Sequence, residues 1–157
     1  MTEEVQRLKA GDTLPEFELL DQDGVLTSSK DLFKVPTILY FFPAAESPGC
    51  TKEASDFEAH LNEFVSRGYQ IVGVSPDSVQ RLKSFEEAHE LSFKLLSDPD
   101  VVAHKAFGAH GEKSLYGRLY KGVLRSTILI RDGKVHEALY NVKATGHTNM
   151  LLRKLGG

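Results

Sequence analysis

The chain has 157 residues, of which 41% are hydrophobic and 9% aromatic, and this is enough for the core of one domain spanning residues 1–157. Its formal net charge of −3 excludes the strongly basic surface that is typical of nucleic-acid-binding proteins. The longest nearly apolar stretch, residues 36–45, is too short to cross a bilayer, so we expect no membrane partner.

The single cysteine, Cys50, limits the possible chemistry. One thiol cannot form an internal disulfide or supply a cysteine-rich zinc or iron–sulfur site. The six histidines include no His-x-x-x-His pair, and no glycine-rich phosphate loop follows a strand pattern. We therefore expect no cofactor and no metal. A chain without disulfides, whose first residues are charged, is also expected to be cytoplasmic.

The first half of the chain alternates between hairpin, strand and helix patterns. Residues 17–20 and 25–27 flank a glycine-containing turn and predict a β-hairpin. Residues 37–42 are apolar, aromatic or β-branched without a break, which is typical of a strand buried on both faces. A helix is predicted from residues 47–48 to a stop at Gly68, with this inward face: Ala54, Phe57, Leu61, Phe64 and Val65.

The second half continues the alternation. Strands are predicted over residues 69–75, 93–96, 127–130 and 134–140, and helices over residues 79–89, 98–107 and 146–155. Residues 114–122 show no regular pattern and are expected to be irregular. Strand, helix and strand in succession predict a right-handed βαβ unit. The expected fold class is therefore α/β, with a mixed central sheet flanked by helices.

Cys50 falls in the first turn of the helix that follows the strand at residues 37–42. Unpaired backbone N–H groups and the helix dipole both favour negative charge there, so they favour the reactive thiolate. The carboxyl end of a strand is also where α/β proteins place their functional sites. An isolated cysteine is otherwise a small buried apolar residue, and the residues beside Cys50 decide between the two interpretations.

Those neighbouring residues form a distinctive pattern. Pro43, Ser47 and Cys50 have the spacing Pro-x-x-x-Ser-x-x-Cys, which resembles the signature of the peroxiredoxins. Three longer segments resemble the bacterioferritin-comigratory-protein or peroxiredoxin Q branch of that family: residues 10–17, 40–54 and 116–127. This resemblance implies a thioredoxin-like fold with an N-terminal β-hairpin extension. It also implies a thioredoxin-dependent peroxidase for hydrogen peroxide and organic hydroperoxides.

The resemblance assigns roles to individual residues. Cys50 would be the peroxidatic cysteine, which attacks peroxide and becomes a sulfenic acid. Ser47 would donate its hydroxyl to the peroxide, and it also suits the N-cap of the helix. Pro43 would shield the thiolate from water. Arg125 would stabilise the thiolate and the departing oxygen, while Glu53 either orients Arg125 or merely complements the helix dipole.

Arg125 also stands out without the resemblance. It comes immediately before the apolar run at residues 128–130, so its strand enters the core. A guanidinium in that place needs an anion or several acceptors. An arginine at the entrance of a strand is more often part of a surface ion pair, but Cys50 as a candidate partner favours an active-site role.

The chain departs from the resembled branch at Ser55. Many members carry a resolving cysteine there, five residues after the first. Either this chain naturally has one cysteine, or Ser55 replaces a resolving cysteine. In both cases the sulfenic acid must be resolved by an external thiol: thioredoxin, glutaredoxin or a small thiol.

Two functional hypotheses follow. The first is a one-cysteine peroxiredoxin, and the second is a non-catalytic redox sensor or binding protein with a thioredoxin fold. The set Pro43, Ser47, Cys50 and Arg125 favours the enzyme, because a binding module does not need all four. Relatives in the resembled branch are commonly monomers, so a monomer is expected.

Overall fold

The computed structural model of this chain describes residues 7–115 and 117–155. For residues 113–115 and 120 it describes the backbone only. Its strands are β1 (Glu18–Asp21), β2 (Leu26–Ser28), β3 (Thr37–Phe41), β4 (Gln70–Ser75), β5 (Lys94–Ser97), β6 (His110–Leu115), β7 (Arg118–Val123), β8 (Ser126–Arg131) and β9 (Lys134–Leu139). One sheet has the order β2-β1-β5-β4-β3-β8-β9, and β6 pairs with β7 separately. Within the sheet, β3, β4 and β5 are parallel, whereas β8 is antiparallel to β3.

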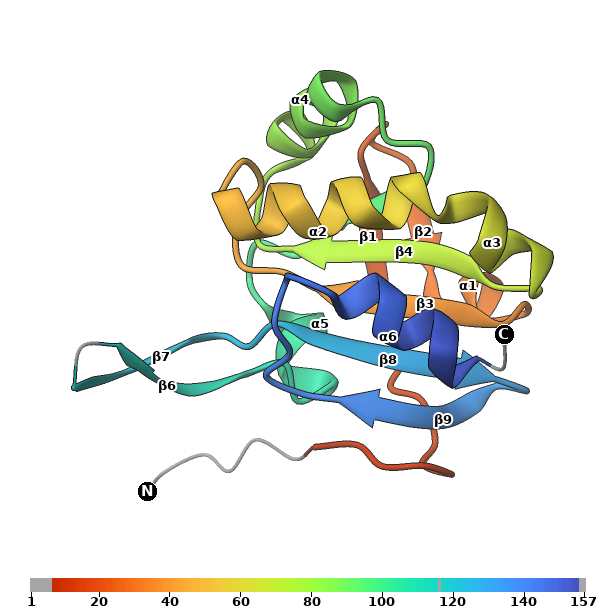
Figure 1. The fold of residues 1–157 in the computed structure, drawn as a ribbon. Coiled ribbons are helices and arrows are strands. Elements are labelled where there is room, and N and C mark those ends of the chain that lie inside the picture. The colour runs from red at the N-terminus through yellow and green to blue at the C-terminus, as the bar shows by residue number, and fades with distance from the viewer. Residues whose placement is uncertain (1–6, 116, 156–157) are drawn as a thin grey trace.

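Helices cover both faces of this sheet. They are α1 (Ser29–Leu32), α2 (Pro48–Ala59), α3 (Leu61–Ser66), α4 (Val79–His89), α5 (Val102–Ala106) and α6 (His147–Lys154). One hydrophobic core lies under α2, α4 and α6, and a second lies under α1 and α5 (Figure 1). Among the described residues, no helix has the length and apolar character needed to cross a membrane.

The central strand β3 supplies both cores. Ile38 and Tyr40 belong to the core beneath α2, and Leu39 and Phe41 belong to the opposite core. All five residues of β3 are buried, as expected for a strand with helices on both sides. The predicted strand is therefore confirmed, and it leads the chain to the N-terminus of α2.

The helix expected over residues 48–67 is two helices. His60 leaves the helical conformation, with φ −106° and ψ 12°, between α2 and α3. The break changes which side chains face inward: Phe64 is buried, whereas Val65 is 58% exposed. The prediction that Val65 faces the core is therefore wrong, because the helical period does not continue unchanged across His60.

The expectation that residues 114–122 are irregular is also wrong. In the described part of this range, β6 pairs antiparallel with β7, and the turn contains Gly117 at φ +78°; Tyr116 lies outside the described residues. Figure 1 shows this hairpin projecting from the sheet. Among the described side chains of this hairpin, Leu119 is 71% exposed, whereas Val123, where β7 meets the domain, is buried. The projecting part therefore shows no alternation of apolar and polar residues that would predict a strand.

The other predicted elements are confirmed within a residue of their expected ends, except α5. That helix begins at Val102 instead of residues 98–100. The Asp98 carboxylate accepts the backbone N–H groups of Val102 and His104, so residues 98–101 form the turn before the helix. The mixed α/β sheet and the N-terminal hairpin are both as expected.

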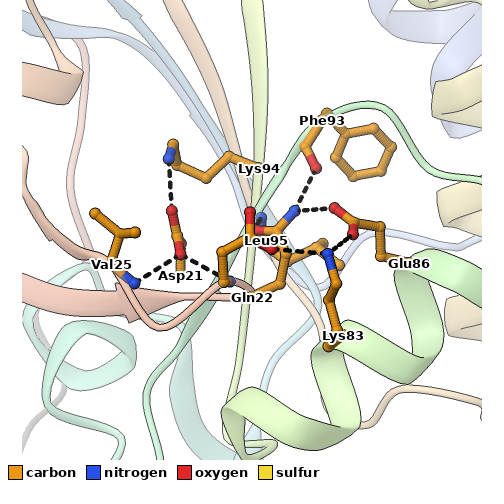
Figure 2. Close-up of polar contacts among 9 residues, drawn as sticks. Asp21, Gln22, Val25, Lys83, Glu86, Phe93, Lys94 and Leu95 are labelled. Atoms are coloured by element: carbon orange, nitrogen blue, oxygen red, sulfur yellow. Dashed lines mark hydrogen bonds and ion pairs between the residues drawn. The ribbon is translucent and has the colours of Figure 1, made fainter.

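Gln22 fastens the N-terminal hairpin to the central sheet (Figure 2). Its Nε2 donates to the carbonyl of Phe93 at 3.1 Å and to Oε2 of Glu86 at 2.6 Å. Its Oε1 accepts the backbone N–H of Leu95 at 2.9 Å. Because β1 pairs with β5 as far as Asp21, the side-chain amide of Gln22 continues the ladder where a peptide group would otherwise stand.

We predict that Gln22→Ala lowers the free energy of unfolding by about 2–3 kcal/mol, because it leaves the buried N–H of Leu95 and carbonyl of Phe93 without partners. Urea unfolding of both proteins measures the difference. Asp23→Ala is the control, since it removes an exposed ion pair with Lys83 and is expected to cost less than about 1 kcal/mol. Equal losses in the two variants would contradict this role of Gln22.

Candidate active site

Cys50 is the third residue of α2 and lies beyond the carboxyl end of β3. Its side chain is buried, with 1% of the residue exposed. Pro48 opens the helix, and the backbone N–H groups of the first turn have no partner within the helix. The thiol therefore lies at the positive end of the helix dipole, as the sequence predicted.

The loop before Cys50 continues directly from the sheet. The N–H of Phe42 donates to Val74 O, which extends the pairing of β3 with β4 toward the half-buried Pro43. Ser47 occupies the N-cap position with an extended backbone, as predicted. Its hydroxyl does not cap the helix, however, because it donates to Ala44 O at 2.9 Å.

Arg125 reaches the thiol from the neighbouring strand. It immediately precedes β8, whose first residue, Ser126, lies opposite Phe41 at the end of β3. Arg125 Nη2 donates to Cys50 Sγ at 3.3 Å. A Cβ at Gly49 would lie 3.2 Å from the same Nη2, so glycine at this position leaves room for the guanidinium. The structure thus brings together two residues that are far apart in the sequence.

Glu53 holds the other side of the guanidinium. Arg125 Nη1 donates to Glu53 Oε1 at 2.7 Å, so the carboxyl orients the arginine, which is one of the two roles that the sequence left open. Glu53 is fully buried, and its Oε2 has no hydrogen-bond partner. Burial raises the pKa of Glu53 to about 7, although the charge and hydrogen bond of Arg125 act to lower it. Near neutral pH this carboxyl is therefore divided between its protonated and ionised forms.

Two further buried side chains, His147 and Tyr40, lie near Cys50, Glu53 and Arg125. The sequence analysis assigned neither of them to the site. His147 Nε2 lies 2.7 Å from Thr127 Oγ1, and burial together with the charge of Arg125 lowers the pKa of His147 to about 4. Burial raises the pKa of Tyr40 well above its usual value. Both side chains are thus neutral near pH 7. Their positions depend on tertiary contacts that have no local sequence signal.

This arrangement suits thiolate chemistry. A cysteine at a helix N-terminus, beside a guanidinium, is stabilised as the nucleophilic thiolate. The described residues contain no group of three His, Cys, Asp or Glu side chains that could hold a metal ion. The fold and the site together define a thiol-based redox enzyme of the thioredoxin-like class.

Comparison with known proteins identifies the family. The model of the AhpC/TSA family matches residues 10–138. The chain is 49% identical over 150 residues to Rv2521 of Mycobacterium tuberculosis strain H37Rv, whose name assigns it to the peroxiredoxins; the alignment covers 95% of this chain and 96% of that one. It is 38% identical over 149 residues to peroxiredoxin Bcp of Escherichia coli strain K12, covering 94% and 96% of the two chains.

A solved structure agrees with these sequences. The bacterioferritin comigratory protein of Xanthomonas campestris superposes with a TM-score of 0.84 at 34% identity, covering 92% of this chain and 97% of that one. The chain therefore belongs to the AhpC/TSA family, as a peroxiredoxin of the Bcp/PrxQ subfamily. The thioredoxin-like fold and the peroxidase expected from the sequence are confirmed, and the non-catalytic alternative is not supported.

We predict that Glu53 makes stability fall as pH rises. The folded pKa of about 7 exceeds the ordinary value of 4.5, so the folded state binds more protons between these values. The stabilisation is present below pH 4.5 and is lost as pH rises through 7, with a total of up to about 3 kcal/mol. The measurement is the difference in unfolding free energy between the wild type and Glu53→Gln across this range.

The lowered pKa of His147 gives the opposite slope between pH 6.5 and about 4, because there the unfolded state binds more protons. This contribution is present in the wild type and in Glu53→Gln, so it cancels in their difference. A difference that does not change with pH would mean that Glu53 has the same pKa in the folded and unfolded states, and it would contradict the raised pKa.

Proposed function

We propose that Cys50 is the peroxidatic cysteine of a cycle that reduces hydrogen peroxide and organic hydroperoxides and is completed by an external thiol. The observation that carries this proposal is the 3.3 Å contact between Arg125 Nη2 and a buried thiol at a helix N-terminus. The substrate class is supported by the Xanthomonas campestris relative, whose structure is described in terms of its alkyl peroxide reduction activity.

In the first step, the thiolate of Cys50 attacks one oxygen of ROOH. The S–O bond forms as the O–O bond breaks, which leaves Cys50 as sulfenic acid and releases RO⁻. The released RO⁻ takes a proton from solvent and departs as the alcohol, or as water when R is hydrogen. Arg125 stabilises the thiolate before the attack and the charge on the leaving oxygen during it.

Ser47 and Pro43 act on the same step. The Ser47 hydroxyl donates to Ala44 O, and rotation about its side-chain torsion would redirect that donor to a bound peroxide oxygen. Pro43 has no backbone N–H and is half-buried. In the proposed step it shields the thiolate of Cys50 without offering a donor to water. The peroxide is thus positioned while bulk water is kept from the thiolate.

The second step requires an external thiol. Ser55, on α2, is exposed, and a serine hydroxyl cannot form a disulfide with the oxidised Cys50. A thiol R′SH attacks the sulfenic sulfur, giving a mixed disulfide and water, and a second thiol then releases Cys50 as R′SSR′ forms. Thioredoxin, glutaredoxin or a small thiol would supply both equivalents.

We also propose the setting in which this cycle operates. A steady supply of reduced thiol favours a reducing compartment such as the cytoplasm. The cycle needs neither a metal nor an organic cofactor, because the oxidised group is Cys50 itself. A monomer, with residues 1–157 as one domain, remains our expectation, as does the lack of nucleic-acid and membrane partners.

We predict that a stoichiometric pulse of hydrogen peroxide adds one oxygen atom to Cys50, because the chain has no second thiol to capture the sulfenic acid. Mass spectrometry with a sulfenic-acid trap checks this. Excess peroxide is expected to carry Cys50 on to irreversible sulfinic acid, and dithiothreitol is expected to prevent that loss. A Cys50–Cys50 disulfide between two chains as the main product would overturn the scheme.

We predict that Ser47→Ala slows peroxide reduction by about 100-fold, because it removes a donor to the reacting oxygen. Alkylation of Cys50 by iodoacetamide should change much less, since that reagent does not use the hydroxyl. Stopped-flow kinetics of both reactions makes the comparison. Ser47→Thr keeps the hydroxyl and serves as the matched control. Equal losses in both reactions for Ser47→Ala would leave Ser47 without a role in peroxide binding.

A further inference from the structure

Asp77 joins the carboxyl ends of three parallel strands. Its Oδ2 accepts the backbone N–H of Ala45, beyond β3, at 2.6 Å and the hydroxyl of Ser75, the last residue of β4, at 2.9 Å. The carbonyl of Asp77 accepts the hydroxyl of Ser97, the last residue of β5, at 2.6 Å. The side chain is only 10% exposed. Asp77 is therefore fixed by the sheet, and it fixes Ala45 in turn.

Ala45 lies in the middle of the loop that binds peroxide in the proposed function. The preceding carbonyl, of Ala44, accepts the Ser47 hydroxyl. The following residue, Glu46, has φ +70°, a conformation that costs free energy for any residue except glycine. Its carboxylate lies 3.2 Å from His89 Nε2 on α4. A strained turn of this kind keeps its shape only when outside contacts hold it. The hydrogen bond from Ala45 N–H to Asp77 is partly buried, whereas the contact of Glu46 with His89 is exposed.

The side chain of Asp77 does not cap α4, the helix that follows it. Asp77 and Ser78 are both suited to cap α4, but the side chain of Ser78 is the one that accepts the N–H of Arg81. Arg81 meets the outer oxygen of Asp77, Oδ1, at 3.2 Å, and it is 63% exposed. The inner oxygen of Asp77 is thus left free to serve the active-site loop.

We propose that Asp77 is a positioning residue, which clamps the loop of residues 43–47 from the β4 side while Arg125 holds Cys50 from the β8 side. The clamp keeps the Ser47 hydroxyl and the Ala44 carbonyl in the positions that peroxide binding requires. It also keeps the buried sulfur closed to a bulky thiol, which can reach the sulfenic acid only when the loop moves. This inference rests on the proposed function, because it assumes that peroxide binds at Ser47 and that resolution is external.

The clamp predicts opposite effects on the two half-reactions. In Asp77→Ala, the rate constant for peroxide reduction should fall by about tenfold, the effect of losing one charge-assisted hydrogen bond. Alkylation by iodoacetamide should change by less than about threefold, because Arg125 and the helix N-terminus remain. Reaction of the preformed sulfenic acid with reduced thioredoxin should become about threefold faster or more, because the loop opens more readily. Asp77→Asn keeps an acceptor for Ala45 and should restore most of the wild-type behaviour.

Ser78→Ala is the matched structural control, since it weakens α4 at the adjacent residue without touching the bond to Ala45. Its three rate constants should stay near those of the wild type even where its unfolding temperature falls. Parallel losses of all three rates in Asp77→Ala, or unchanged rates, would overturn the clamp, and Asp77→Asn gives the same comparison if the alanine variant does not fold. A wild type that forms no sulfenic acid would instead overturn the proposed function.

Discussion

The largely buried guanidinium of Arg125, with 16% of its side chain exposed, is the constraint on which the active site depends. A buried positive charge is costly unless hydrogen-bonded anions surround it. Cys50 and Glu53 meet that need together, because residues three apart in a helix lie on the same face. The guanidinium reaches that face because β8 is the antiparallel neighbour of β3, and Gly49 leaves room for it, since a Cβ there would lie 3.2 Å from Nη2.

The charges in this cluster leave the positive charge of Arg125 mainly to the sulfur of Cys50. One guanidinium faces two acidic groups, and Glu53, with a pKa of about 7, is partly protonated at neutral pH. The neighbouring His147 is neutral because its pKa is lowered to about 4, and it neither repels Arg125 nor competes for Cys50. The positive charge of Arg125 is therefore directed at the thiol to the extent that Glu53 keeps its proton. A fully ionised Glu53 would compete for the same cation.

Residues close together in sequence could be predicted from their spacing, whereas a residue brought in by tertiary contacts could be predicted only where its own position raised a chemical demand. Pro43, Ser47 and Cys50 lie within one loop and one helical turn, so their spacing alone carries a signature. Arg125 was found because an arginine before an apolar strand needs an anion. Asp77 was missed because its partner is a backbone N–H, that of Ala45, and every residue except proline has that donor.

The fold was predictable for a similar reason. The strands at 37–41 and 70–75 are apolar throughout because two cores bury them, and burial on both faces leaves a strong signal in the sequence. The break at His60 and the projecting hairpin of β6 and β7 leave none. The first interrupts a periodic pattern without a proline or glycine, and the second projects from the sheet, where its exposed Leu119 belongs to no apolar pattern.

A peroxiredoxin with one cysteine has to satisfy two opposing demands at one sulfur atom. Peroxide is small and reacts best in a rigid, water-poor site, which the burial of Cys50 provides. An external thiol is larger, and it must align with the sulfur at the end of a buried helix. A second cysteine at position 55 would not remove the conflict, because residues five apart on a helix point in diverging directions, and Ser55 is exposed where Cys50 is buried. Either route therefore requires the first turn of α2 and its preceding loop to open. The contacts that hold this loop closed, from Asp77 on one side and Arg125 on the other, then set the balance between fast peroxide reduction and fast recovery.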